Sequence, residues 1–307
     1  MLGELVITAQ GLTRYFGRKA VVHDMELRIP RGSVTGLLGL NGAGKTTTLR
    51  MLLGFLEPTR GECQIFGRNS QSLTREDRAR IGYTAEGHFL YGWMTVRQSQ
   101  EFQRSTFPNF NIGLFTDTVR RFGIDPGQKN RTLSRGQRAG VSLALTLATE
   151  PELLILDDPA LGLDPVSRRA LNETLLDFCD GGQRTILLSS HLLDDVERVA
   201  DRVAVMVHGR LLVNTTVDDF RERVAAWSLD LPPASRACES IPGLIQARAL
   251  GGRTVVTVAD PDQETAAAIA RLSTSEPERL SVTFEDAVIA YLSRSRDSQS
   301  FLAHTGA

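Results

Sequence analysis

The sequence has few cysteines, no excess of either charge and no long apolar run. Only Cys63, Cys179 and Cys238 are cysteines among its 307 residues, an odd number at scattered positions. A disulfide framework needs a dense, even set, so we expect free thiols and a reduced, cytoplasmic interior. The formal net charge of −1 argues against a general nucleic-acid binder, which would carry a basic excess.

The apolar runs are too short to cross a membrane. The best of them, from Val141 to Ala148, is interrupted by Ser142 and Thr146, whereas a span needs about 20 residues. Residues 1–10 carry an early glutamate and lack a basic start followed by an apolar block, so we expect no signal peptide. If this protein works at a membrane, another subunit must supply the membrane part.

Strands alternate with helices over residues 4–224, which predicts an α/β fold with a mostly parallel sheet wound on both faces. The length predicts one large domain followed by a small one, and we place them at 1–225 and 226–307. In the second we expect a strand over 254–259, helices over 264–272 and 284–292, and a loose tail from Ser293. Strands are expected over 4–10 and 24–29, with an aromatic turn at 13–17 between them.

One stretch carries a phosphate-binding pattern. Residues 34–52 read as a strand, a tight glycine loop and a helix, and Gly39, Gly44, Lys45 and Thr46 match Gly-x-x-x-x-Gly-Lys-Thr. Glycines let successive N–H groups point into one hollow, at which the following helix aims its positive end. Lys45 would then contact the β- and γ-phosphates of a nucleotide, and Thr46 would bind Mg²⁺.

Further motifs follow this loop in a fixed order. They are Glu86, the run Leu133-Ser134-Arg135-Gly136-Gln137, the apolar strand 153–156 with Asp157 and Asp158 at its end, Leu163-Asp164, and His191. The set resembles the nucleotide-binding subunit of ATP-binding cassette (ABC) transporters over residues 4–224. Its closest similarity is to ABC-2-type exporter ATPases.

The resemblance implies a P-loop NTPase core of the ABC ATPase type. Such a core has a mostly parallel sheet, an antiparallel β part and a helical subdomain, here at about 87–150, followed by a small C-terminal α/β domain. It also implies ATP and Mg²⁺ as ligands. The residues implied to bind ATP are Phe16, Asn41, Gly42, Ala43, Gly44, Lys45, Thr46, Thr47, Ser134, Gly136 and Gln137.

Two groups of implied residues serve the metal and the chemistry. Thr46, Glu86 and Asp157 match the metal ligands, and Asp158, His191, Glu86 and Lys45 match the catalytic residues. In this family Ser134 and Gly136 close over ATP held by a second copy, so the resemblance implies a dimer, here expected to be a homodimer. It further implies a membrane permease as partner and a cytoplasmic place on the inner face of the membrane.

Structural alternatives remain for single residues. Phe16 could be a core aromatic, Asp157 a turn residue, His191 a helix-start residue, and Asp164 a plain N-cap. Three residues also depart from the usual family pattern: Asp158 replaces a glutamate, Glu86 a glutamine and Arg135 a glycine. Aspartate is one methylene shorter than the usual base, which must reach its proton. A nucleotide-gated module with slow hydrolysis, or a soluble ABC ATPase without a transport role, therefore stay open as alternatives.

The loop after Glu86 carries large apolar side chains: Phe89, Leu90, Tyr91 and Trp93. In the family this region grips cytoplasmic helices of the membrane subunit, and such side chains suit that role. The alternative is a loop folded back on its own core. The small C-terminal domain could serve dimer contact, regulation or stability.

Overall fold

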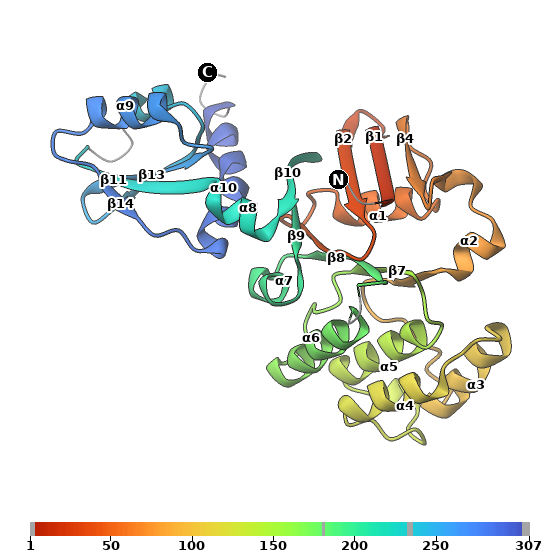
Figure 1. Ribbon diagram of the computed structural model, residues 1–307. Coiled ribbons are helices and arrows are strands. Elements are labelled where there is room, and N and C mark those ends of the chain that lie inside the picture. The colour runs from red at the N-terminus through yellow and green to blue at the C-terminus, as the bar shows by residue number, and fades with distance from the viewer. Residues whose placement is uncertain (1–3, 180–181, 232–235, 303–307) are drawn as a thin grey trace. The chain divides into compact units, whose positions relative to one another are not determined.

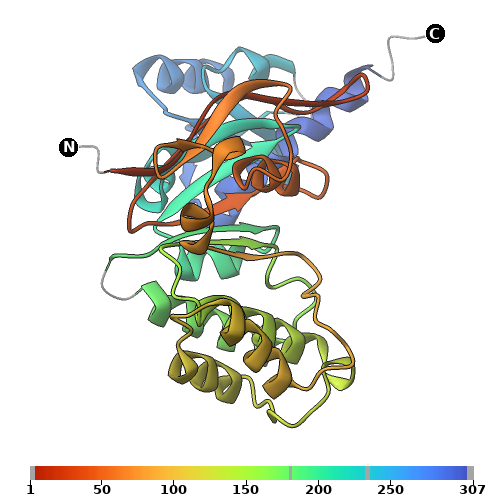
Figure 2. The ribbon, with the colours of Figure 1, turned by 90° about the vertical axis from the view of Figure 1, so that its right-hand side faces the viewer.

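The computed structural model describes residues 4–179, 182–231 and 236–302. The chain divides into two compact units, Met1–Asn214 and Thr215–Ala307, and Figures 1 and 2 show their elements from two sides. This division falls before the boundary at 225 expected from the sequence, because α8 (Val217–Glu222) and β11 (Val224–Leu229) build the second unit.

The first unit is built on a sheet with strand order β10-β9-β3-β8-β7-β6. Pairing is parallel from β9 through β3, β8 and β7 to β6. Every residue of β3, β7 and β8 is buried, as expected for apolar strands covered on both faces. The strands are β3 (Val34–Leu38), β6 (Ile81–Thr84), β7 (Leu153–Asp157), β8 (Thr185–Ser190), β9 (Arg202–Val207) and β10 (Arg210–Thr216).

An antiparallel sheet with order β2-β1-β4-β5 forms the second layer of this unit. Its first strands are longer than expected. The strand β1 runs through the aromatic pair to Phe16, and the chain turns after it at Gly17, because register shifts let β1 bend without ending. The strands are β1 (Leu5–Phe16), β2 (Lys19–Pro30), β4 (Arg60–Ile65) and β5 (Arg68–Asn69).

Three helices of the first unit form a group of their own. In Figure 1, α3, α4 and α5 gather in the helical subdomain, coloured yellow to light green, away from β1, β2 and β4. They share an apolar core that includes Val96, Phe115 and Val141, and the segment around Pro108 separates α3 from α4. The helices are α1 (Lys45–Leu52), α2 (Arg75–Ala79), α3 (Val96–Thr106), α4 (Ile112–Arg121), α5 (Arg135–Leu147), α6 (Pro165–Cys179) and α7 (Leu193–Val199), with 3₁₀ turns at Ser70–Ser72 and Asn130–Thr132.

The second unit is an antiparallel sheet with order β12-β13-β11-β14 and three flanking helices in its described part. The strand expected over 254–259 and the helix expected over 264–272 are present as β13 and α9. The last helix continues to Leu302, because no glycine or proline interrupts it. Residues 303–307 of the expected tail lie outside the described residues. The remaining elements are β12 (Leu244–Leu250), β13 (Arg253–Ala259), β14 (Glu278–Leu280), α9 (Gln263–Leu272), α10 (Phe284–Leu302) and a 3₁₀ turn at Arg236–Ser240.

Two expectations from composition can be compared with these elements. Cys63, Cys179 and Cys238 are free thiols, as expected. Over the residues that the structure describes, no helix is both long and apolar enough to cross a bilayer.

Candidate functional site

The phosphate loop, residues 39–47, follows β3 and includes the first residues of α1, and neighbouring segments pack against it. Gly44 has a φ of 107°, and a Cβ there would stand 2.6 Å from the carbonyl oxygen of Val21, so glycine is required. The Gly209 N–H, in the turn between β9 and β10, donates to the Ala43 carbonyl oxygen at 3.0 Å. Two separate segments therefore hold the loop in its curled form.

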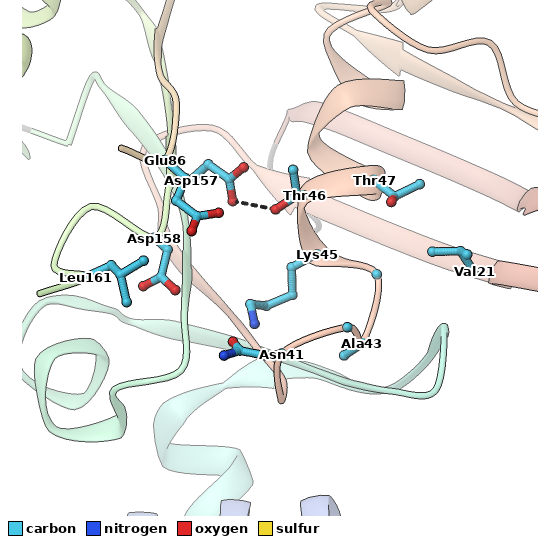
Figure 3. A pocket seen from close by; sticks show the side chains of 12 residues that line it. Val21, Asn41, Ala43, Lys45, Thr46, Thr47, Glu86, Asp157, Asp158 and Leu161 are labelled. Atoms are coloured by element: carbon cyan, nitrogen blue, oxygen red, sulfur yellow. Dashed lines mark hydrogen bonds between the residues drawn. The ribbon is translucent and has the colours of Figure 1, made fainter. Parts of the chain in front are cut away.

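Lys45 and Thr46, at the start of α1, point into the same pocket (Figure 3). The Lys45 ammonium donates to the Gly39 carbonyl oxygen at 2.6 Å. Burial lowers the pKa of Lys45, and the nearby carboxylates of Asp158, Asp157 and Glu86 oppose that shift. The Thr46 hydroxyl donates to Oδ1 of Asp157 at 3.1 Å. A cation and a hydroxyl thus face the acids that follow β7.

The two acids at the end of β7 have different partners. Asp157 is 2% exposed, and its Oδ1 accepts from both Thr46 and Ser189. Oδ2 of Asp158 lies 2.7 Å from Nδ1 of His191. Oδ1 of Asp158 is buried and has no hydrogen-bond partner among the residues that the structure describes. One carboxylate therefore faces α1, and the other keeps an oxygen available for a further donor.

These groups line one cavity of about 340 Å³. Figure 3 shows Glu86, Asp157 and Asp158 on one side of it and Lys45 with Thr46 on the other. Most of the residues expected from the sequence meet here, and His191 reaches the cavity's edge through Asp158. The lining residues are Val21, Asn41, Gly42, Ala43, Gly44, Lys45, Thr46, Thr47, Glu86, Asp157, Asp158 and Leu161.

Phe16 does not line this cavity. Its side chain is 49% exposed at the end of β1, and the Arg14 guanidinium lies 4.9 Å from the ring centroid. Phe16 is therefore not a core aromatic, and one face of its ring carries a cation–π contact.

Ser134, Gly136 and Gln137, which the resemblance implied to bind ATP, also lie outside the cavity, at the start of α5. The Ser134 hydroxyl accepts from the Gln137 N–H at 3.1 Å, and the Gln137 side chain accepts from the Ser134 N–H at 3.0 Å, which forms a capping box. Gly136 is buried against α6, where an added Cβ would lie 2.0 Å from the Ser167 hydroxyl oxygen. Asp164 accepts from the Ser167 N–H and hydroxyl, so it is the N-cap of α6 that the sequence left as an alternative.

Three residues of the site were missed by the sequence reasoning. Val21 and Leu161 line the cavity, and no local pattern points to either. Ser189 bonds both acids, and its only signal was its place at the end of an apolar strand, two residues before His191.

The side chains after Glu86 form an exposed patch. We name Phe89, Tyr91, Trp93 and Phe102 the aromatic surface. The first three are 86%, 61% and 67% exposed, and the Tyr91 ring centroid lies 6.2 Å from those of both Trp93 and Phe102. Leu90 instead packs partly against the core of the helical subdomain. A cavity of about 370 Å³ opens between this surface and α5.

The cavity beside the phosphate loop suits a magnesium–polyphosphate ligand. Loop N–H groups and a buried ammonium match phosphate oxygens. Within the described part of the chain, no three His, Cys, Asp or Glu side chains cluster to hold a metal unaided. Mg²⁺ does not require such a cluster, because it binds through one or two protein oxygens together with waters and phosphates. Thr46, Asp157 and Glu86 can supply those oxygens.

The comparisons with known proteins agree with this geometry. Residues 22–161 match the family model described as ABC transporter. The chain is 34% identical over 214 residues to the Nod factor export ATP-binding protein I of Rhizobium johnstonii, a match that covers 68% of each chain. The chain therefore belongs to the family of ABC transporter ATP-binding proteins, as the sequence predicted.

Two further matches describe the fold and the extent of the likeness. The "Probable multidrug ABC transporter ATP-binding protein YbhF" of Escherichia coli (strain K12) is 33% identical over 231 residues; the match covers 73% of this chain but 39% of that relative. A solved structure of the ATP binding subunit of an ABC transporter has a TM-score of 0.64 at 28% identity, over 71% of this chain and 92% of that one. The expected ABC ATPase fold is thus confirmed.

Proposed function

We propose that this chain is the ATP-hydrolysing subunit of an ABC exporter, which dimerises around ATP and drives a separate membrane permease. The observation that carries the proposal is the cavity in which the Lys45 ammonium and the Thr46 hydroxyl face Asp157 and Asp158. The loop from Asn41 to Thr47 would hold the phosphates of ATP. Thr46, Asp157 and Glu86 would hold Mg²⁺, which offsets the charge that develops on the phosphates.

Asp158 would orient and deprotonate the attacking water. Its Oδ2 is engaged by His191 at 2.7 Å, so its direction is set. Its unpartnered Oδ1 is the oxygen that can accept a hydrogen bond from the water. His191 would hold this carboxylate and contact the γ-phosphate. Lys45 would neutralise charge on the β- and γ-phosphates in the transition state.

The start of α5 would complete the site of a second copy. Ser134 is exposed and Gln137 is half-buried, while Gly136 packs close to α6. A helix N-terminus with a hydroxyl beside it is an anion site. Ser134, Gly136 and Gln137 would therefore contact the nucleotide in the phosphate loop of the partner protomer, and Phe16 would stack on adenine.

The aromatic surface would dock the permease. Large apolar side chains that stay exposed at this density mark a surface that another protein covers. The occupant we propose is a short cytoplasmic helix of the membrane subunit, with its apolar face in the cavity beside Tyr91 and Phe102. This contact would hold the ATPase at the inner face of the membrane. We propose the C-terminal domain, residues 226–307, as an accessory domain.

Phosphate release by the purified full chain tests the proposal. We expect Mg²⁺-dependent ATP hydrolysis that falls at least a hundredfold in Asp158→Asn, because amides do not accept the proton. ATP binding should persist in that variant. Equal hydrolysis by Asp158→Asn and the parent would refute the role given to Asp158.

Single-turnover hydrolysis by Asp158→Glu separates a working ATPase from a slow nucleotide-gated module. Comparable rates for the parent and Asp158→Glu favour the ATPase, since the shorter acid is then already in reach. A large gain with glutamate favours the slow module.

Co-purification with a multi-span membrane protein, lost in Tyr91→Asp, tests the transport assignment.

A further inference from the structure

Ser189 lies beside Asp157, the acid proposed to bind Mg²⁺, because of the register between two strands. The parallel strands β7 and β8 pair Asp157 with Ser189, and neighbours at one register position of a sheet point to the same face. Ser189 is fully buried. Its hydroxyl therefore needs partners inside the protein.

Those partners are the two acids. The Ser189 hydroxyl donates to Oδ1 of Asp157 at 2.8 Å and accepts the backbone N–H of Asp158 at 2.9 Å. Asp157 Oδ1 also accepts from Thr46, and Asp158 Oδ2 contacts His191. A continuous hydrogen-bonded chain thus runs from α1 to His191, with Ser189 at its centre.

The hydrogen bond that the Ser189 hydroxyl accepts from the Asp158 N–H affects the backbone conformation of Asp158. Asp158 has a φ of 47°, in the left-handed region that non-glycine residues seldom adopt. Such a conformation persists only where the surroundings hold it. The Ser189 hydroxyl holds the backbone of Asp158, and His191 holds its side chain.

We propose that Ser189 is a positioning residue for ATP hydrolysis, which fixes Asp157 toward Thr46 and Asp158 in its left-handed turn. The inference rests on the proposed function. Because one hydroxyl bonds to both acids, its loss should disturb both the binding of Mg²⁺ by Asp157 and the orientation of the attacking water by Asp158. Loss of ATP affinity is not expected, since Ser189 does not line the cavity.

The test compares variants of the full chain for kcat, KM for ATP and the Mg²⁺ concentration at half-maximal rate. Equilibrium binding of a fluorescent ATP analogue is measured alongside, and its dissociation constant in Ser189→Ala should stay within about threefold of the parent. Ser189→Ala should lower kcat about 10–100-fold and raise the Mg²⁺ requirement, as loss of an outer partner of a metal ligand does. KM should stay within about threefold. Ser33→Ala is the control, because Ser33 is also buried, lies directly before β3, and donates its hydroxyl to the Pro30 carbonyl oxygen, away from the site.

A second pair keeps the test decisive if the alanine variant folds poorly. Ser189→Thr and Ser189→Val have the same shape, but only threonine keeps the hydroxyl. We expect the threonine variant to exceed the valine variant at least tenfold in kcat. Equal rates for the two, parental kcat in Ser189→Ala, or an equal loss in Ser33→Ala would each overturn the proposal.

Lys45→Ala separates this inference from the proposed function. Parental hydrolysis by Lys45→Ala would mean that the activity does not come from this site, and both would fail. If Lys45→Ala is inactive while Ser189→Ala keeps the parental kcat and Mg²⁺ dependence, only the role of Ser189 fails.

Discussion

The ammonium of Lys45 donates a hydrogen bond to the carbonyl oxygen of Gly39 across 2.6 Å. The lysine thus returns to the first residue of its own loop. Its side chain is only 8% exposed, so the charge already stands inside the cavity. A phosphate entering the loop meets a preorganised cation, which lowers the cost of ordering on binding.

We therefore predict that Lys45→Ala lowers the affinity for ATP at least tenfold. A buried charge-assisted contact to phosphate is worth more than about 1.4 kcal/mol. Equilibrium binding of a fluorescent ATP analogue measures it, and thermal unfolding checks that the variant is folded. An unchanged dissociation constant would show that Lys45 of the phosphate loop does not contribute to ATP binding.

Gly136 should be required for packing independently of any nucleotide. An added Cβ would stand 2.0 Å from the Ser167 hydroxyl oxygen, so Gly136→Ala should cost about 1–3 kcal/mol of stability. The double variant Gly136→Ala with Ser167→Gly should recover part of that loss. Denaturant unfolding of the four proteins gives the coupling energy. Strict additivity would show that the contact with Ser167 is not the cause.

The aromatic surface should matter for transport rather than for ATP binding. Tyr91→Asp places a charge between Trp93 and Phe102, where a docked apolar helix could not solvate it. We expect loss of permease binding and of transport, with ATP affinity within about twofold of the parent. Leu250→Asp, at a side chain 56% exposed in the second unit, is the control. Full transport with Tyr91→Asp would argue against docking here.

Glu152 should make the stability depend on pH. Its carboxylate accepts from Arg80 at 2.6 and 2.9 Å and from Arg31 at 3.1 Å. The hydrogen bond from Arg80, followed by that from Arg31, lowers the pKa of Glu152 to about 2 from 4.5. A lowered carboxyl pKa stabilises the fold above the unfolded pKa, and this stabilisation is lost as pH falls from about 4.5 toward 2.

Glu152→Gln should accordingly lower Tm by about 2–4 °C at pH 7, since a partly exposed ion pair is worth about 1 kcal/mol. The gap should shrink by pH 3.5, where the parent has lost part of its advantage. Glu173→Gln is the control, because its partner Arg169 is largely exposed; its Tm should follow the parent within about 1 °C. A gap that is equal at both pH values would contradict the titration of Glu152.

Segments whose conformation depends on a few neighbouring residues could be predicted from the sequence. The phosphate loop is one, because Gly42 and Gly44 supply the positive φ angles that curl it, and Lys45 and Thr46 follow directly. The end of β7 is another, since an apolar run that stops at two acids marks the ligand edge of a parallel sheet. The second unit was predicted less well from the sequence, because three of its strands lack a strict alternation. The strand β11 is buried along most of its length, β12 is mostly exposed, and β14 has only 3 residues.

The sequence by itself determined the fold family, the phosphate loop and the identity of the acids, because each depends on local order along the chain. Only the tertiary structure decided that Ser189 joins Asp157 to Asp158, that Val21 and Gly209 brace the loop, and that Gly136 meets Ser167. Those contacts join residues distant in sequence, through strand register and helix packing. No local pattern encodes that register, because it follows from how the whole sheet and its helices bury their apolar faces together.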